Sequence, residues 1–466
     1  MVNKNRDLKK FALIHLGTDE VYGLEYVAAE IKRLGHKFQW FDGDLASVAD
    51  DIIAWQPSYM CFSTLTTFFP QALSLSRNVK SRSPEIKSVF GGHHVTAVPD
   101  VHTSDGVDII VPGPVFGTIE KIAADTAENI IKGYPIPMHQ MMPARREYFE
   151  EVGSIGSRHR KTIMSHFGCP YNCSYCSTHL LKKEYGKEYR KYWLTRRPVD
   201  KVIQEAKIFL EFPTKEVALE DDDMLFGKEV EKWLPEFADA WKKTIGLPIH
   251  GNVTPNTVVK VSDNTLDTLA ELVVGVQMGV QAARRDTLKL YNRQFQNEEQ
   301  VAKAIERLKS RGIPVKLELI IGAPVEDPVG DAIDTIKLAQ RVGAGTFVAA
   351  FPLMLYPGTA LYKWCLENNI RMKDDCNFDC YSGEGSVLFD SDTQKKITNI
   401  SKMAAFFVKY NIEEHWMRAL IEMDPNSTSA RKLSESIYFE SLRFQLGDQI
   451  DRTEFEKILA NTRFKY

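Results

Sequence analysis

Three cysteines within eight residues are the side chains of this sequence best suited to chemistry. Cys169, Cys173 and Cys176 lie in the segment GCPYNCSYCST. Closely spaced thiolates can hold an iron–sulfur cluster, and a cubane [4Fe–4S] cluster normally takes four cysteine ligands. The next cysteine along the chain is Cys365, far downstream. The sequence therefore predicts a [4Fe–4S] cluster in which one iron stays open to a small-molecule ligand.

Two other uses of these cysteines fit the segment less well. A zinc site takes four ligands and favours pairs of cysteines two residues apart, and although His166 or His179 can supply a fourth ligand, gaps of three and then two residues are unusual for zinc. A disulfide framework is disfavoured because the chain has only seven cysteines in 466 residues. Phe167, Tyr171 and Tyr175 surround the cysteines and are expected to shield a cluster from water.

The net charge and the composition are typical of a folded globular protein. Lys and Arg number 59 against 62 Asp and Glu, a net charge of −3, so no basic excess points to nucleic acid. The basic run at 190–198 is interpreted as solvated surface. The apolar stretch at 11–17 is too short for a signal sequence or a membrane span. With free thiols and no targeting segment, we therefore expect a cytoplasmic protein without a membrane span or a nucleic-acid partner.

Short apolar segments alternate with amphipathic ones over residues 1–140, which predicts a doubly wound parallel sheet of the Rossmann-like kind. Such sheets bind ligands at the carboxyl ends of their strands. Helices are expected between the strands, the last of them over 116–133. The strand ends are rich in Gly, Ser and Thr; they fall at residues 17–18, 41–43, 63–67, 91–94 and 113.

A linker is expected at 141–160, and a second alternating series follows it. This series predicts a partial (β/α)6 barrel over 161–370, whose active face lies at the carboxyl ends of the strands. Residues 371–466 are expected to be mainly helical. The predicted barrel strands lie in the segments 161–168, 216–226, 247–256, 275–283, 315–324 and 344–359.

The spacing CxxxCxxC, with Tyr175 before the last cysteine, closely resembles the signature of the radical SAM superfamily. Over roughly 160–365 the resemblance continues through LEDDDMLF, MGVQAARRDTLKLYNR, ELIIGAPVED and PLMLYPGT, in the family's order. In that family SAM binds the open iron, and one electron from the cluster cleaves SAM to a 5′-deoxyadenosyl radical. The resemblance also implies an external electron donor such as flavodoxin or ferredoxin.

The same resemblance suggests which strand ends contact SAM. Asp222 and Asp223 are expected at its amine or ribose, although either can instead cap a helix. Gln281 and Arg293 lie where relatives direct groups to the ribose or the carboxylate, although Arg293 can equally form a salt bridge. Two further positions complete the set: Gly322 beside the adenine, unless it only serves a tight turn, and Tyr356 as the catalytic candidate in the last active-face loop.

The N-terminal segment resembles the cobalamin-binding domain that precedes many radical SAM domains, through FDGD, VFGGHHVTAVP and VDIIVPG. Tyr22 stands where related domains carry a histidine that binds cobalt, so any cobalamin is expected without a histidine on the metal. A domain that no longer binds a corrinoid is the alternative. The residues expected to contact cobalamin are Ser63, Thr64, Thr67, Gly91, Gly92, His93 and Gly113.

Together the two resemblances imply a cobalamin-dependent radical SAM methyltransferase that acts on an unactivated carbon or phosphorus centre. The alternative is a non-methylating radical SAM cyclase, dehydratase or rearrangement enzyme. A tRNA methylthiotransferase is disfavoured because the N-terminal segment has only Cys61. A corrinoid carrier or iron–sulfur scaffold would not explain the SAM-site patterns. Cys365, Cys376 and Cys380 are interpreted as packing or reactive thiols rather than as ligands of a second cluster.

Overall fold

The computed structural model of the chain describes residues 8–137, 140, 142–343, 347–373, 384–424, 426–429 and 432, except for the side chains of 189 and 190. Cys376 and Cys380 lie outside the described residues. The chain divides into two compact units. The first contains residues 1–172, 176–215 and 356–359, and the second contains 173–175, 216–355 and 360–466.

The first unit contains a five-stranded parallel sheet in the order β2-β1-β3-β4-β5. The order reverses beside β1, as in a doubly wound fold. Even-numbered side chains such as Ala12, Met60 and Phe90 pack in one core on a single face, because neighbouring residues of a strand point to opposite faces. The strands are β1 (Lys10–Ile14), β2 (Lys37–Phe41), β3 (Tyr59–Ser63), β4 (Lys87–Gly91) and β5 (Ile109–Val111).

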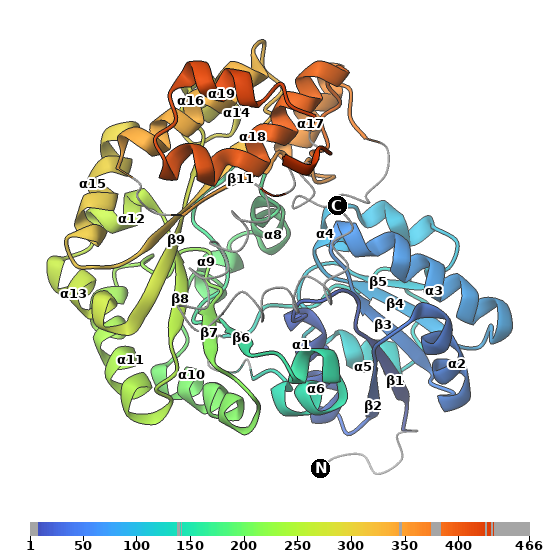
Figure 1. The fold of residues 1–466 in the computed structure, drawn as a ribbon. Helices are drawn as coiled ribbons and strands as arrows, with labels where there is room; N and C mark the ends of the chain where they lie inside the picture. The colour runs from blue at the N-terminus through green and yellow to red at the C-terminus, as the bar shows by residue number, and fades with distance from the viewer. Residues whose placement is uncertain are drawn as a thin grey trace. The chain divides into compact units, whose positions relative to one another are not determined.

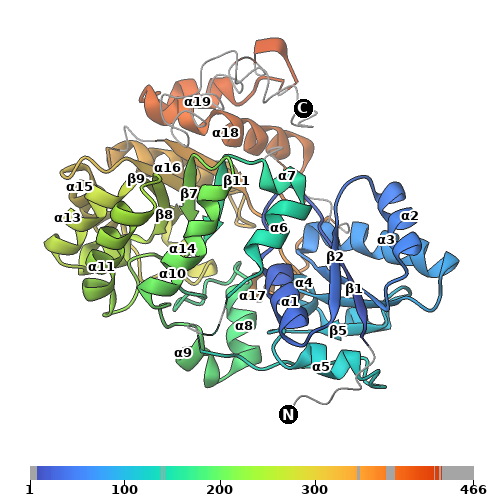
Figure 2. The same ribbon diagram turned by 90° about the horizontal axis from the view of Figure 1, so that it is seen from below.

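Helices cover both faces of this sheet (Figures 1 and 2). Helices α2 and α3 contact each other, and so do α1 and α5. The Asp44 side chain accepts hydrogen bonds from the first turn of α2, which fixes where that helix begins. The bounds are α1 (Tyr22–Arg33), α2 (Leu45–Trp55), η1 (Thr66–Phe68), α3 (Phe69–Arg82), α4 (His93–Ala97), η2 (Pro99–Thr103) and α5 (Thr118–Ala123).

Two expectations about the first unit are wrong in detail. The helix expected over 116–133 ends at Ala123, because Asp125 takes a left-handed conformation and Ile130 then forms a bridge with Ile110. The segment 141–160 is more than a linker, since it contains two helices. The later elements of this unit are α6 (Arg145–Glu151), α7 (Gly153–Gly156), β6 (Arg160–Ile163), α8 (Thr178–Tyr185), α9 (Glu188–Tyr192), α10 (Val199–Ala206) and η4 (Lys207–Glu211).

The second unit contains parallel strands in the order β11-β10-β9-β8-β7. One face is apolar and buried under helices, with Val276 and Leu317 fully buried. The other face carries polar side chains. These strands are β7 (Glu216–Leu219), β8 (Ile249–Val253), β9 (Val273–Gln281), β10 (Val315–Ile321) and β11 (Val348–Pro352). Together with β6 of the first unit they are the strands expected from the sequence, and the α/β class with parallel sheets is confirmed.

Helices α11, α13, α15 and α16 lie along the outer side of this sheet (Figure 1). Helix α15 begins with a capping box, in which the side chains of Asn297 and Gln300 each accept a backbone N–H of the other. The helices of the unit are α11 (Val230–Thr244), α12 (Pro255–Lys260), α13 (Asp263–Leu272), α14 (Arg285–Leu290), α15 (Glu298–Lys309), α16 (Pro328–Arg341), α17 (Ala360–Glu367), α18 (Ser391–Lys409) and α19 (Glu414–Leu420).

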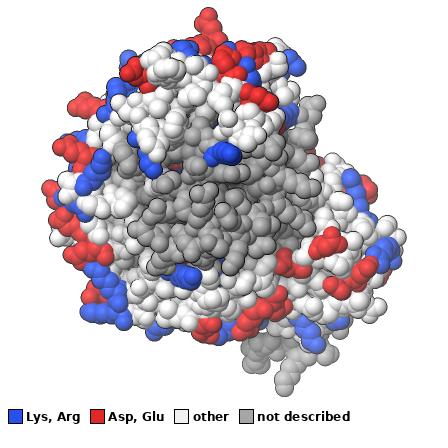
Figure 3. Space-filling model, in the orientation of Figure 1, with Lys and Arg blue, Asp and Glu red and all other residues white. Residues whose placement is uncertain are grey.

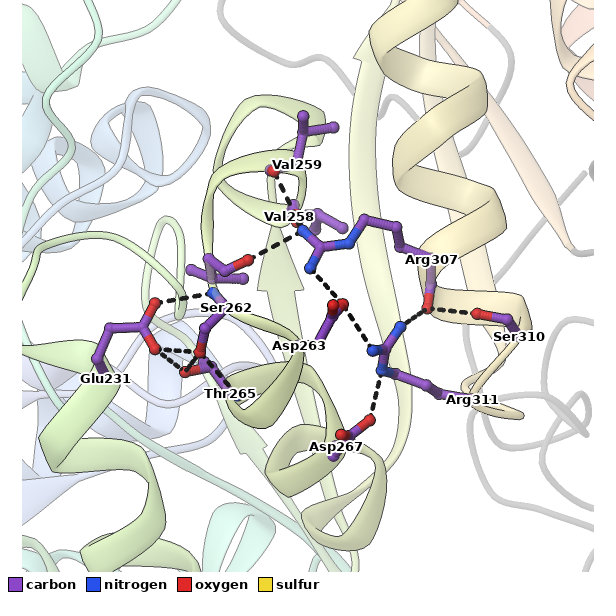
Figure 4. A network of polar contacts seen from close by, with 11 residues as sticks. Glu231, Val258, Val259, Ser262, Asp263, Thr265, Asp267, Arg307, Ser310 and Arg311 are labelled. Carbon is purple, nitrogen blue, oxygen red and sulfur yellow. Dashed lines mark hydrogen bonds and ion pairs between the residues drawn. The ribbon is translucent and has the colours of Figure 1, made fainter.

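Charged side chains link these outer helices to one another (Figure 4). Arg307 of α15 donates to the carbonyl oxygen of Val258 at 2.6 Å and to Asp263 at 2.7 Å, and Arg311 donates to the same carboxylate. Glu231 of α11 accepts the backbone N–H at the start of α13 at 2.9 Å. The network therefore fixes α11, α13 and α15 relative to one another on the outside of the sheet.

The described surface mixes both signs of charge. On the face shown in Figure 3, side chains of both signs are scattered among uncharged residues over the described part of the surface. Of the helices in the described part of the chain, none combines the length and the apolar character that crossing a bilayer requires.

Candidate active site

The three closely spaced cysteines lie in an irregular loop between β6 and α8. Cys173 is 7% exposed, whereas Cys169 and Cys176 are partly exposed. The backbone N–H of Thr178, in the first turn of α8, donates to the Cys176 sulfur at 3.5 Å. A sulfur in this position faces the positive end of a helix, which stabilises a thiolate.

These thiols fit an iron–sulfur cluster better than a single metal ion. Within the described residues, no three His, Cys, Asp or Glu side chains gather around one point as the ligands of one ion would. In a cubane each thiolate binds a different iron, so the sulfurs need not converge. A set of three thiols with no fourth cysteine nearby suits a cluster that keeps one iron open.

Arg293 lies beside the buried cysteine. It is 5% exposed and follows α14. Its Nη1 donates to the Cys173 sulfur at 3.4 Å and to the Tyr175 hydroxyl at 3.2 Å. Its Nη2 donates to the Gly279 carbonyl and to Gln296 Oε1, both at 2.8 Å. The guanidinium thus joins the cysteine loop to the end of β9.

The two aspartates expected at SAM have different surroundings. Asp223 is fully buried, and its carboxylate accepts from the hydroxyls of Thr254 and Thr257 at 2.8–3.0 Å and from the N–H of Leu225 at 3.2 Å. It ties the end of β7 to the start of α12. Asp222 is exposed. Of the two, Asp222 is the carboxylate that a ligand can reach.

Gln281, at the carboxyl end of β9, has a left-handed backbone with φ of 72° and a partly exposed side chain. A residue other than glycine rarely adopts this conformation, and such strain is common at functional sites. Gly322 follows β10, also with φ of 72°, and a side chain there would meet Ile397 and Phe389. Gly322 is therefore explained by its turn and by packing, and the positive φ of Gln281 coincides with an irregularity in the register between β9 and β10.

The last active-face loop, Tyr356–Thr359, belongs to the first unit. The Thr359 hydroxyl donates to the Tyr356 carbonyl at 2.7 Å, which closes the turn. A side chain at Gly358 would lie 2.5 Å from the carbonyl oxygen of Ala97, at the end of α4. The loop after β11 therefore lies directly on the element that follows β4.

The residues expected at cobalamin lie along one edge of the N-terminal sheet. Ser63 pairs with Gly91 in the register, and the Thr64 N–H donates to the Gly91 carbonyl at 2.9 Å. Gly92 has φ of 92°, and a side chain there would lie 2.6 Å from the Thr64 nitrogen. Four of the predicted small residues are partly exposed: Ser63, Gly91, Gly92 and Gly113. Because these residues are small, the edge fits a large cofactor that contacts backbone.

The other predicted residues of this edge differ in how far their side chains are exposed to solvent. His93 is exposed and Thr67, in η1, is partly exposed. His94 is buried beside Thr66, 3.2 Å from its hydroxyl, and burial lowers the pKa of His94 to about 4. His93 is therefore the histidine of this pair that can face a ligand, and His94 is a neutral structural residue.

The edge of the N-terminal sheet that carries these residues, here called the cobalamin edge, lies against the two segments of the first unit that flank the cysteine loop. Helix α4 contacts α8, which begins directly after the cysteine loop. Gly113, at the end of β5, lies against α8, because a side chain there would be 3.4 Å from Cγ of Glu184. Phe167, just before the loop, packs on Tyr26 of α1 with ring centres 5.8 Å apart. The sheet edge therefore lies next to both ends of the segment that carries the cysteines.

A buried charge cluster, which the sequence analysis did not find, lies behind Tyr22. Arg145 of α6 is fully buried and forms ion pairs with Glu20, Glu25 and Glu205 at 2.8–3.0 Å. Its Nη2 donates to the Tyr22 hydroxyl at 2.6 Å. Tyr22, expected from the sequence at the place of a cobalt-binding histidine, thus has its hydroxyl turned toward this buried cluster. In the sequence, Arg145 is one of several charged residues in PARREYFEEVG, and nothing in that segment indicates that it is buried.

The comparisons with known proteins agree with this geometry. Residues 163–339 match the model of the radical SAM superfamily, and residues 15–123 match that of the B12-binding domain. An uncharacterized methyltransferase of Pyrococcus horikoshii is 22% identical over 397 residues, 75% of this chain and 79% of the relative. The hopanoid C-3 methylase of Methylococcus capsulatus is 27% identical over 223 residues, 41% of this chain and 42% of the relative.

Two solved structures share the fold at low identity. TsrM from Kitasatospora setae, with cobalamin and a [4Fe–4S] cluster bound, has a TM-score of 0.62 at 14% identity, over 78% of this chain and 75% of that chain. OxsB, with aqua-cobalamin and SAM bound, has a TM-score of 0.68 at 11% identity, over 97% of this chain and 75% of that chain.

Fold, site and family matches together define a radical SAM enzyme with a B12-binding domain. The chain is homologous to the cobalamin-dependent radical SAM methyltransferases. Its cofactors are accordingly a [4Fe–4S] cluster, SAM and cobalamin, as expected from the sequence.

Proposed function

We propose that this enzyme transfers a methyl group to an unactivated carbon or phosphorus centre of a small molecule. When bound, the cluster supplies the electron that cleaves SAM, and cobalamin supplies the capacity to carry a methyl group.

One observation carries the proposal: the cobalamin edge of the N-terminal sheet is next to the cysteine loop. Helix α4 contacts α8 on one side and the Tyr356–Thr359 loop on another. A methyl group can reach a substrate radical only if both reactive centres face the same small space. The adjacency of α4, α8 and the last active-face loop within one compact unit supports this requirement.

Each set of residues has a proposed role. Cys169, Cys173 and Cys176 hold the cluster, and Asp222 and Gln281 orient SAM. Tyr356 is proposed to contact the substrate from its loop. The cobalamin set, proposed to hold the cofactor through backbone and small side chains, is Ser63, Thr64, Thr67, Gly91, Gly92, His93 and Gly113.

The polar face of the second unit's sheet supports a substrate that forms hydrogen bonds. Gln277 donates to Asn252 at 3.2 Å and accepts from Lys316 at 2.9 Å, and Lys316 lies 3.7 Å from Glu318. These side chains extend across neighbouring strands on a partly exposed face. A substrate with hydrogen-bonding groups can use the remaining donor and acceptor positions of these side chains, whereas a substrate made only of hydrocarbon would remove them from water without adding a hydrogen bond.

The products of SAM distinguish the proposal from its non-methylating alternative. Full-length protein, reconstituted with iron, sulfide and cobalamin, is incubated anaerobically with SAM and a flavodoxin- or ferredoxin-type reductant. We expect 5′-deoxyadenosine, which reports cleavage, together with S-adenosylhomocysteine, which reports methyl donation and requires cobalamin. The variant with all three cluster cysteines changed to Ala serves as the control and should form no 5′-deoxyadenosine.

The alternative predicts a different product pattern. Formation of 5′-deoxyadenosine without S-adenosylhomocysteine, at saturating cobalamin, would favour a cyclase, dehydratase or rearrangement enzyme. Absence of both products from a protein that contains its cluster would contradict both functions.

A further inference from the structure

Arg293 is a buried cation whose acceptors include a thiol but no carboxylate. Among the described residues, its hydrogen-bond acceptors are the Cys173 sulfur, the Tyr175 hydroxyl, the Gly279 carbonyl and Gln296 Oε1. The partly exposed Arg284 is different, because it pairs with Asp334 at 2.7 Å and Asp327 at 3.1 Å. A guanidinium withdrawn from water is costly unless an anion compensates it. Of the acceptors around Arg293, the Cys173 sulfur is the one expected to bind the iron–sulfur cluster.

We propose that Arg293 is a positioning residue for the iron–sulfur cluster, which holds Cys173 as a thiolate ligand and raises the cluster's reduction potential. A fixed positive charge 3.4 Å from a ligand sulfur stabilises the reduced cluster, which carries one more negative charge than the oxidised cluster. An N–H···S hydrogen bond acts in the same direction.

The loop around Cys173 is anchored so that this contact can persist. The Ser174 hydroxyl donates to the Leu290 carbonyl at 2.6 Å, and the Ser174 N–H donates to the Tyr291 carbonyl at 3.0 Å. The rings of Tyr175 and Tyr291 pack edge to face with their centres 5.2 Å apart. Residues 173–175 are therefore bonded to the end of α14, three residues before the arginine.

This role differs from the one that the sequence suggested for Arg293, which was recognition of the SAM carboxylate. Both Nη groups are engaged within the protein, and the buried Nε is the guanidinium nitrogen for which the described residues provide no acceptor. A carboxylate-binding arginine would affect SAM affinity and leave the potential of SAM-free protein unchanged. A cluster-positioning arginine would change that potential before SAM is added.

The test is a redox titration of full-length protein, reconstituted with iron and sulfide and free of SAM and cobalamin. The reduced cluster is followed by electron paramagnetic resonance. Arg293→Met removes the positive charge with little change in side-chain size, and Arg293→Lys keeps the charge. Arg284→Met is the control, because it removes a positive charge from an arginine that is paired with aspartates. Iron content and circular dichroism are measured for each variant.

We expect a lower midpoint potential in Arg293→Met, a smaller decrease in Arg293→Lys, and the wild-type value in Arg284→Met. If Arg293→Met folds but loses its iron, retention of the cluster by Arg293→Lys would support the same role. A wild-type potential in an iron-replete Arg293→Met protein would overturn the proposal, as would equal loss of iron in both Arg293 variants. Because neither SAM nor cobalamin is present, this outcome is independent of whether the enzyme transfers methyl groups.

Discussion

At the end of β7, burial determines which of two neighbouring aspartates can contact a ligand. Asp222 and Asp223 are equivalent in the motif LEDDDMLF. In the fold, Asp223 holds Thr254 and Thr257 from a fully buried position, whereas Asp222 is exposed. The sequence alone cannot separate them, because which of two adjacent residues turns inward depends on the path of the chain after the strand.

We expect opposite phenotypes when each aspartate is changed to Asn. Asp222→Asn should weaken SAM binding about tenfold and leave stability unchanged, because it removes a charge that a ligand can contact. Asp223→Asn should destabilise the protein by roughly 1–3 kcal/mol, since buried hydroxyl and N–H donors lose a charged acceptor. Isothermal titration with SAM and thermal unfolding measure the two effects. Equal SAM affinity in the wild type and Asp222→Asn would remove Asp222 from the site.

Gln281 gives a second prediction for a single residue. Its left-handed backbone costs roughly 1–2 kcal/mol in a residue other than glycine. Gln281→Gly should therefore raise the melting temperature while weakening SAM binding. Gln281→Ala is the matched control, since it keeps the strain and also loses the side chain. A stabilised Gln281→Gly protein with unchanged SAM affinity would show that the strained glutamine has only a structural origin.

At the scale of elements, alternating apolar segments predicted the parallel sheets correctly, because strand and helix periods are set by local geometry. They did not predict where helices stop. The helix expected through residue 133 ends at Ala123, where Asp125 leaves the helical conformation and Ile130 returns to pair with Ile110. That bridge is a tertiary contact, and nothing in the local pattern specifies it.

The glycine after β4 supports the cobalamin edge and can be tested against a matched glycine. Gly92 and Gly35 both have left-handed backbones, with φ of 92° and 79°. A side chain at Gly92 would meet the backbone of Thr64, whereas one at Gly35 would meet nothing within 4 Å. We expect Gly35→Ala to cost about 1 kcal/mol and to keep cobalamin binding.

Gly92→Ala should cost more, because Thr64 and its hydrogen bond to Gly91 must move. Cobalamin affinity should fall at least about tenfold. Thermal unfolding and titration with hydroxocobalamin provide the measurements. Wild-type affinity in Gly92→Ala would show that this strand end does not contact the cofactor.

At the scale of the whole molecule, buried charges join segments that are far apart in sequence. Glu20, Glu25 and Glu205 surround Arg145, and Arg197 pairs with Glu205 at 2.6 Å. Burial raises the pKa of Glu25 to about 8, so this carboxyl keeps its proton well above its usual range.

Stability should depend on pH through Glu25. Between about pH 4.5 and pH 8 the folded protein holds a proton that the unfolded chain has released, so the contribution of Glu25 to the unfolding free energy falls as pH rises across this window. In Glu25→Gln this slope should disappear. The unfolding free energy of the variant, relative to that of the wild type, should therefore increase by more than about 1 kcal/mol between pH 5 and pH 8.

Glu147 of the neighbouring helix α6 is the control for this measurement. A hydrogen bond from Lys32 lowers its pKa, so it is ionised throughout the window and Glu147→Gln should change no slope between pH 5 and pH 8. Denaturant unfolding at several pH values measures both variants. Parallel curves for the wild type and Glu25→Gln would show that Glu25 is ionised in the fold.

The cysteines of the site could be predicted from the sequence, whereas the long-range contacts that position them could not. Cysteine spacing is set by the cluster itself, so Cys169, Cys173 and Cys176 could be predicted locally. The contacts of Arg293 with Cys173 and of Arg145 with Glu25 join residues more than a hundred positions apart. Such pairs depend on the folded path of the chain, and a single sequence carries no direct record of them.

We propose that one chain binds cobalamin beside its cluster with no histidine on cobalt, since Tyr22 is turned toward Arg145. The most direct test is titration of the full chain with hydroxocobalamin, followed by reduction to cobalt(II) and electron paramagnetic resonance. We predict binding of one cobalamin per chain and a cobalt signal without the splitting that an axial histidine nitrogen produces. No stoichiometric binding, or a signal with nitrogen splitting from a protein histidine, would contradict the account.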